Sequence, residues 1–110
     1  MEVTFSTGKL QKLCNSASKL RGDYGPRMAK LIQTRLSDLV AANHLGEFRN
    51  LPGRCHQLTA DLRWHCALDL VHPDRLVFRS ANDPLPLNDS GTLNWDKVTK
   101  IEIVAIGDYH

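Results

Sequence analysis

Several features that mark specialised classes of protein are missing from this sequence of 110 residues. Its three cysteines, Cys14, Cys55 and Cys66, are an odd number without CxxC spacing, which argues against both a disulfide framework and a zinc site. No apolar stretch approaches the roughly 20 residues that a membrane helix requires, and no internal repeat appears. We therefore expect one globular domain, residues 1–110, that does not associate with a membrane.

The composition favours a cytoplasmic protein. Hydrophobic residues make up 42% of the chain and charged residues 24%, which are the proportions of an ordinary soluble globule. The first residues, Met1–Phe5, do not combine a basic region with an apolar one, so we expect no signal peptide.

The net positive charge is small, but arginine is concentrated in one part of the chain. The net charge of +2 permits nucleic-acid binding without requiring it. Between positions 49 and 79 the sequence places Arg49, Arg54, Arg63, Arg75 and Arg79 against three acids, Asp61, Asp69 and Asp74. The planar guanidinium suits phosphate better than the ammonium of lysine does. The simpler alternative is a solvated sheet face with local ion pairs.

Hydrophobic spacing predicts a strand and two helices in the first half of the chain. Apolar and polar residues alternate over Glu2–Ser6, as in a short strand. Ser6 or Thr7 is placed to cap a helix that runs to about Leu20, before a break at Gly22–Pro26. Apolar residues then recur every three or four positions to Ala42 or Asn43, which predicts a long amphipathic helix packed on the core.

The second half of the chain reads as a sheet. After a loop at Gly46–Gly53, strand-like runs cover Arg54–Thr59, Cys66–Val71 and Arg75–Ser80, and the turn at His72–Asp74 makes the last two an antiparallel hairpin. A polar loop, Ala81–Leu93, precedes Trp95, which we expect in the core, and a final strand that runs to the C-terminus. This order predicts an α+β domain whose helices pack on one face of a twisted, mainly antiparallel sheet. The other face is left to carry a site.

The chain ends in Asp108, Tyr109 and His110, directly after the apolar run Ile101–Ile106. An acid, a phenol and an imidazole are able to transfer protons or bind phosphate oxygens. If the preceding strand is anchored in the sheet, the three residues form a candidate active site. On an ideal strand Asp108 and His110 point to one face and Tyr109 to the other.

The segments that together resemble a known family are Met28–Leu36, Cys55–Thr59, Pro73–Phe78, Leu93–Trp95 and Ile106–His110. With them the chain resembles the RelE/ParE superfamily of bacterial toxins, and more closely its HigB branch. The resemblance implies an endoribonuclease that cuts messenger RNA, usually during translation, and that needs neither metal nor other cofactor. It also implies a partner encoded beside the toxin, a HigA-like DNA-binding antitoxin.

The resemblance and the residue chemistry together give the candidate site. Asp108 and His110 are the expected acid and base, in either order, and Tyr109 is expected to orient the scissile phosphate or to stack a base. Arg75 is expected to stabilise the transition state. The other expected RNA-binding residues are Arg63, Arg79, Arg54 and His56. Simpler alternatives are an ion pair of Arg75 with Asp69 or Asp74 and an ordinary sheet-face position for His56.

One segment departs from the family pattern. Arg63-Trp64-His65-Cys66 stands where relatives more often have a basic residue, a glycine and a polar residue. Trp64 is either an exposed stacking platform or a hydrophobic cap, and the sequence does not decide between them. Two rival functions therefore stay open: a ParE-like toxin that inhibits a protein such as gyrase without cutting RNA, and a module that only binds its antitoxin and regulates their operon.

Overall fold

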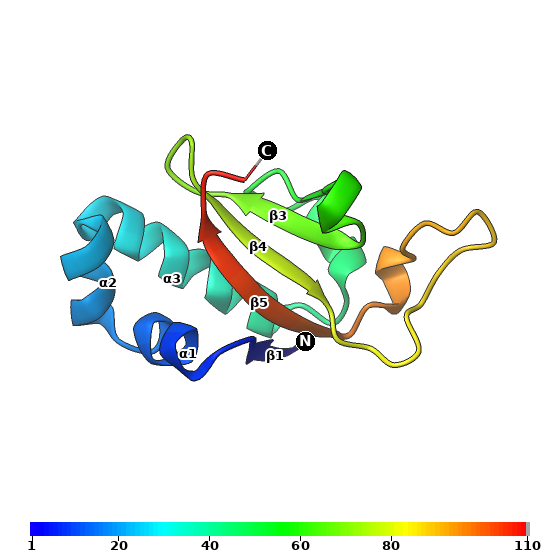
Figure 1. The fold of residues 1–110 in the computed structure, drawn as a ribbon, viewed down its shortest axis with the longest axis horizontal. Helices are drawn as coiled ribbons and strands as arrows, with labels where there is room; N and C mark the ends of the chain where they lie inside the picture. Colours follow the sequence, from blue (N-terminus) through cyan, green and yellow to red (C-terminus); the bar gives the residue numbers. More distant parts are fainter. Residues whose placement is uncertain (110) are drawn as a thin grey trace.

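The computed structural model describes residues 1–109 and confirms the predicted α+β class (Figure 1). Its five strands form one sheet in the order β1-β5-β4-β3-β2, in which β1 is parallel to β5 and the other neighbours are antiparallel. The strands are β1 (Glu2–Phe5), β2 (His56–Gln57), β3 (His65–Asp69), β4 (Arg75–Ser80) and β5 (Lys100–Gly107). The helices are α1 (Gly8–Cys14), α2 (Ala17–Tyr24) and α3 (Pro26–Ala41), with 3₁₀ turns at Leu45–Arg49, Ala60–Leu62 and Trp95–Lys97.

The first predicted helix is in fact two helices. Thr7 caps α1 as expected, because its hydroxyl accepts a hydrogen bond from the Leu10 N–H at 3.1 Å. The chain then leaves the helix, and Ser16 adopts an extended backbone (φ −122°) and accepts a second capping bond from the Lys19 N–H at 3.2 Å. A serine that caps a new helix is more favourable than one inside a continuous helix, so the break falls at Ser16.

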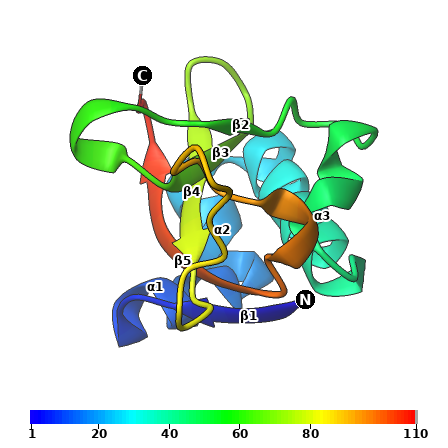
Figure 2. The same cartoon turned by 90° about the vertical axis from the view of Figure 1, so that its right-hand side faces the viewer.

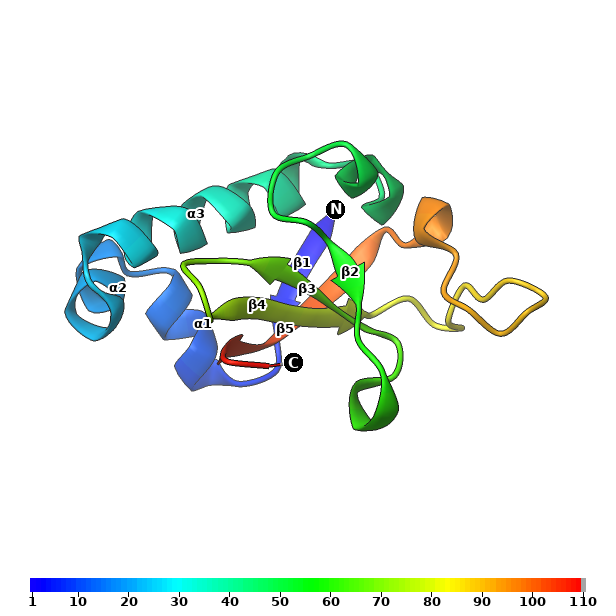
Figure 3. The ribbon, with the colours of Figure 1, turned by 90° about the horizontal axis from the view of Figure 1, so that it is seen from above.

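Helix α3 contributes more buried side chains than α1 or α2. It begins at Pro26, where the missing N–H costs nothing, and buries Met28, Ala29, Ile32 and Leu39 on one face. Figure 3 shows α3 lying along one side of the sheet, with the C-terminus on the other side. The strands meet the helices with their own buried residues, which include Leu68, Leu76, Phe78, Ile101 and Ile103. These contacts make the main core.

The opposite face of the sheet has a smaller apolar patch and a row of polar side chains. Leu58, Ala67 and Val77 are buried there, and Figure 2 shows β3 and β4 lying between α3 and the turn at residues 60–62. Side chains alternate along strands, so residues two positions away from Ala67 and Val77 share their face. These are His65 and Asp69 on β3 and Arg75 and Arg79 on β4. We call this the polar face.

Several boundaries differ from prediction. Strand β2 is limited to two residues because the backbone takes positive φ at Arg54 (48°) and Ala60 (55°), which bends the chain out of the sheet. Part of the predicted loop at 46–53 is the 3₁₀ turn Leu45–Arg49. Trp95 is half-buried and packs against the edge of the core. No helix within residues 1–109 has the length and apolar character needed to cross a membrane.

Packing of α3 predicts a large difference between two apolar residues on the same helix. Ile32 is fully buried in the core, whereas Val40 is 60% exposed. We expect Ile32→Ala to lower the free energy of unfolding by about 2–5 kcal/mol, because it leaves a cavity. Val40→Ala is the matched control and should change that free energy by less than about 0.5 kcal/mol. Urea unfolding followed by circular dichroism measures both, and equal losses would contradict the assigned packing.

Candidate active site

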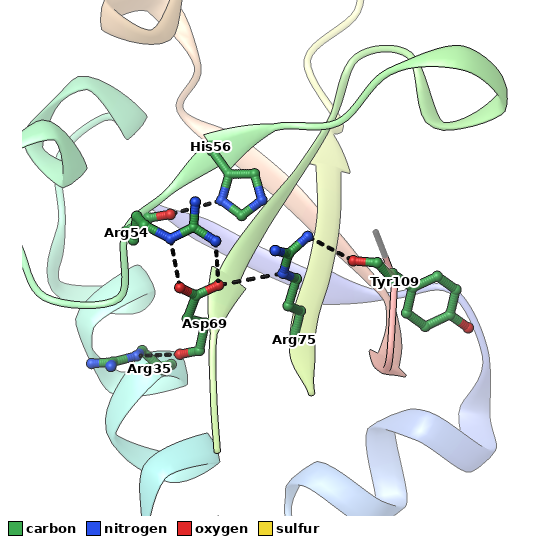
Figure 4. Close-up of polar contacts among 6 residues, drawn as sticks. All are labelled: Arg35, Arg54, His56, Asp69, Arg75 and Tyr109. Atoms are coloured by element: carbon green, nitrogen blue, oxygen red, sulfur yellow. Dashed lines mark hydrogen bonds and ion pairs between the residues drawn. The ribbon is translucent and has the colours of Figure 1, made fainter. Parts of the chain in front are cut away.

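Arg75 lies at the centre of a cluster of charged residues on the polar face (Figure 4). It is the first residue of β4 and pairs in register with Asp69 on β3 and Gly107 on β5. Its side chain is only 13% exposed, and its Nε lies 3.4 Å from Asp69 Oδ1. On the other side, Arg75 Nη1 donates a hydrogen bond of 2.8 Å to the backbone carbonyl of Tyr109. These two contacts fix the orientation of the guanidinium.

Asp69 joins this guanidinium to a second one. Arg54 Nε donates to Asp69 Oδ2 at 2.7 Å, and Arg54 Nη2 donates to Oδ1 at 3.3 Å. The backbone of Asp69 is held as well, because its carbonyl accepts from Arg35 Nε at 3.2 Å and its N–H donates to the Gly53 carbonyl at 2.7 Å. Contacts from α3, the 50–55 loop and β4 therefore converge on Asp69.

The local charges lower the pKa of Asp69. Burial raises the pKa of this carboxyl, but the hydrogen bonds and charge of Arg54 and the charge of Arg75 outweigh it and hold the pKa below its ordinary value. The charge of His56 acts in the same direction. The bond to Asp69 likewise raises the pKa of Arg54. Two guanidinium groups share one carboxylate, so an excess of positive charge is left on this part of the face.

His56 belongs to the same cluster. Its Nδ1 lies 2.8 Å from the Arg54 carbonyl, which orients the ring. Together with Arg54, Arg75 and the apolar side chains of Leu58 and Leu62, it lines a cavity of about 320 Å³. We call Arg54, His56, Asp69, Arg75 and Tyr109 the Arg75 cluster.

The C-terminal segment reaches this cluster through its backbone. Strand β5 ends at Gly107, so Asp108 and Tyr109 follow it outside the regular strand and are exposed. The Tyr109 ring points away from Asp69 (Figure 4), and it folds over Gly107, where an added Cβ would lie 3.0 Å from Tyr109 Cε2. The predicted phosphate contact of the Tyr109 phenol therefore remains a prediction. His110 lies outside the described residues.

Arg63 and Arg79 lie in a second group, away from Arg75. Arg79 is four residues along β4 from Arg75, about 13 Å at the rise of a strand. Its guanidinium pairs with Glu102 Oε1 at 2.6 Å. Arg63 stacks over the Trp64 ring, with 4.5 Å between the guanidinium carbon and the ring centroid. Both arginines line a cavity of about 470 Å³ with Trp64, His65, Asn82, Asp83 and Glu102. We call this cavity the Trp64 pocket.

The sequence does not indicate the organising role of the two acids. It predicts Asp69 only as an alternative partner of Arg75, and that ion pair is present. It gives no sign that Glu102 is the partner of Arg79. Asp69 ends β3 and Glu102 lies near the start of β5, and each is paired across the sheet with the arginine that it binds. The alternation of side chains along each strand could have indicated these pairs, but only with knowledge of which residues of neighbouring strands lie opposite each other.

The arrangement offers guanidinium groups for an anion together with groups that can move protons. Buried or semi-buried guanidinium groups stabilise developing negative charge on phosphate oxygens. His56 and the exposed Asp108 are titratable groups in or near the cluster. Within residues 1–109, no three His, Cys, Asp or Glu side chains are grouped closely enough to hold a metal ion.

The lowered pKa of Asp69 predicts a pH-dependent contribution to stability. A carboxyl whose pKa is depressed by folding stabilises the native state above its unfolded pKa of about 3.9, and this contribution is lost as pH falls through the folded pKa. Asp69→Asn should lower the free energy of unfolding by about 1–3 kcal/mol near neutral pH, because Arg75 loses its charged partner. The difference from wild type should shrink steadily below pH about 4.

Urea unfolding at several pH values measures this difference. Asp61→Asn, at an exposed aspartate in the turn at residues 60–62, serves as the matched control and should show little effect. A loss in Asp69→Asn that is the same at every pH would contradict the ionic role of the carboxylate.

Comparison with known proteins supports the fold alone. No family model matches the chain, and no curated protein matches it. Solved structures with the same fold include a YoeB/ParE toxin from Agrobacterium tumefaciens, with a TM-score of 0.61 and 10% identity over 100% of both chains. They also include a YoeB-YefM complex from Staphylococcus aureus, with a TM-score of 0.57 and 19% identity over 100% of this chain and 97% of that one. The predicted fold is confirmed, since these toxin structures share it, whereas the HigB branch stays a prediction.

Proposed function

We propose that this protein is the toxin of a toxin–antitoxin pair and that it acts as an endoribonuclease on messenger RNA without a metal ion. One observation carries the proposal: the Arg75 guanidinium is bound to the Tyr109 carbonyl at 2.8 Å. This contact anchors the backbone at Tyr109 to Arg75, and Arg75 shares the Asp69 carboxylate with Arg54 on the polar face. The similarity to solved toxin structures supports the proposal through the fold.

The chemistry assigned to the cluster has three parts. The ribose 2′-hydroxyl must lose a proton, negative charge must be stabilised on the phosphate, and the 5′-oxygen must gain a proton. Arg75 supplies the charge stabilisation, and Arg54 and His56 help to bind the RNA backbone. Asp108 and His110 are the acid and the base, in an order that the kinetics must assign.

Asp69 prepares Arg75 for this role. It contacts the Nε side of the guanidinium, while the Tyr109 carbonyl contacts Nη1, so the fork is already oriented before a phosphate arrives. Preorganised donors stabilise a transition state without reorganisation during the reaction. Arg54 and Arg75 share the Asp69 carboxylate, so these three side chains together keep one positive charge to attract an anionic substrate.

The proposed partner is an antitoxin. One of the structurally similar proteins is described as a complex of YoeB with YefM, which is a property of that protein. For this chain we propose a cognate antitoxin of the HigA-like, DNA-binding kind. Its removal would free the toxin to cut messenger RNA on the ribosome and so to inhibit translation.

Cleavage mapping in a cell-free translation reaction tests the nuclease. Wild-type protein and His110→Ala are each added to one messenger, with and without a chelator, and new RNA ends are located. We expect discrete cuts by the wild type that persist in chelator, and a rate about 10²–10⁴ lower for His110→Ala, because one proton transfer loses its catalyst. Intact RNA in the presence of folded wild-type protein would contradict the nuclease and favour a protein target.

Arg75 is the second test in the same assay. Arg75→Ala should lower the cleavage rate about 10²–10³-fold, because a preorganised cation is removed from the transition state. Arg75→Lys should recover only part of this loss, since an ammonium keeps the charge without the fork. The matched control is Arg27→Ala, an exposed arginine at the start of α3, which should cut at the wild-type rate. Equal rates for the two alanine variants would rule out the role of Arg75.

A further inference from the structure

We propose that the Trp64 pocket binds one unpaired nucleobase of the RNA whose phosphate lies at the Arg75 cluster. The inference rests on the proposed function and extends it to how the substrate is recognised. The pocket volume of about 470 Å³ falls within the range typical of small-ligand sites, roughly 300–1,000 Å³. It is lined by an aromatic ring, a stacked guanidinium and hydrogen-bonding side chains, which are the groups that bind splayed-out bases.

Trp64 is held in a fixed orientation at the wall of this pocket. Its backbone has a φ of 67°, a conformation that costs energy for a bulky residue. Its indole N–H donates a 3.3 Å hydrogen bond to the Gly91 carbonyl, and the side chain packs partly against the main core. The sequence left open whether Trp64 is an exposed stacking platform or a hydrophobic cap. The half-buried ring does both, because it packs against the core and also lines the cavity.

Arg63 supplies the second flat group. Its exposed guanidinium lies over the indole with 4.5 Å to the ring centroid. Bases stack on both aromatic rings and guanidinium planes, so a base can add to the outer face of Arg63 or take its place on Trp64. In either arrangement the stack supplies binding energy that depends on the presence of a base and not on its phosphate.

Charge distinguishes the two sites on the polar face. The Arg75 cluster has two arginines and one carboxylate, which leaves a positive excess for phosphate. In the Trp64 pocket, Arg63 and Arg79 are balanced by Asp83 and Glu102, and Arg79 is already paired with Glu102 at 2.6 Å. A charge-balanced pocket suits a neutral ligand. Carboxylate oxygens accept hydrogen bonds from exocyclic amino groups, which adenine, cytosine and guanine have and uracil lacks. The pocket should therefore favour these three bases over uracil.

The position of the pocket fits one RNA strand that crosses both sites. Arg75 and Arg79 project from the same face of β4, about 13 Å apart, with Val77 between them. In Figure 1 the C-terminus and the loop after β4 lie at opposite ends of the β4–β5 pair. An RNA strand bound along β4 therefore places a phosphate at the Arg75 cluster. A base at a short, fixed distance along the RNA then reaches the Trp64 pocket.

The experiment maps cuts over a pool of messengers in the cell-free translation reaction and counts the bases at each offset from the cut. For the wild type we expect uracil to be depleted at one offset. Trp64→Leu should abolish this preference and lower cleavage at the preferred sites about 5- to 100-fold, because a base stack is lost. Trp64→Phe should keep the preference, because phenylalanine stacks without the indole hydrogen bond to Gly91.

Trp95→Leu is the matched control. Trp95 also lies beneath an arginine, at 5.5 Å from Arg49, but that arginine is bound to Asp96 at 2.7 Å on another part of the surface. This variant should keep the wild-type base preference even if its stability falls. Melting curves identify variants whose fold is lost.

The outcomes separate this inference from the proposed function. Cuts that keep their base preference in Trp64→Leu would overturn the inference and leave the nuclease intact. Loss of the preference in both Trp64→Leu and Trp64→Phe would also overturn it, because the indole hydrogen bond and not stacking would be responsible. A wild-type protein that cuts no messenger would contradict both proposals. A uniform loss in Arg75→Ala, without a change of preference, supports the division into two sites.

Discussion

The arrangement of the polar face depends on the Asp69 carboxylate. This carboxylate lies between Arg54 and Arg75, which would repel each other without it. The backbone of Asp69 is fixed by hydrogen bonds to Arg35 and Gly53. Two cations around one anion satisfy the nearby charges and still leave an excess of one positive charge. This is the balance that an anion site requires, because a fully neutralised pair would have little attraction for phosphate and an unpaired, semi-buried arginine would destabilise the fold.

The main core and the proposed site lie on opposite faces of the same strands. On β4, Leu76 and Phe78 face the helices and are fully buried, while Arg75 and Arg79 alternate with them and face the other side. The main core therefore constrains the backbone positions of the charged residues without touching their chemistry. Different apolar residues can fill the same core, and the polar face can differ without disturbing it. This explains how the chain shares its fold with two solved structures at only 10% and 19% sequence identity.

Sequence patterns predicted the elements better than the grouping of site residues. The α3 stripe and the β3–β4 hairpin were clear, because their spacing follows directly from helix and strand periods. The break at Ser16 depends on a competition between capping and helix continuation that periodicity does not detect. The separation of Arg63 and Arg79 from Arg75 depends on register and on the turn at Trp64. Those features arise from tertiary contacts, such as the bond to Gly91.

The end of β5 shows why a short functional motif is hard to interpret from the sequence. An ideal strand would alternate Asp108 and Tyr109 between faces, but regular pairing stops at Gly107, and the following backbone is bound through the Tyr109 carbonyl instead. The side chains are then free of the strand's alternation, while the main chain is still anchored to Arg75. The bond to Arg75 is made by the backbone carbonyl of Tyr109 and not by its phenol. A backbone carbonyl is a group that every residue carries, so neither the residue types at this end of the chain nor their spacing indicates such a contact in the sequence.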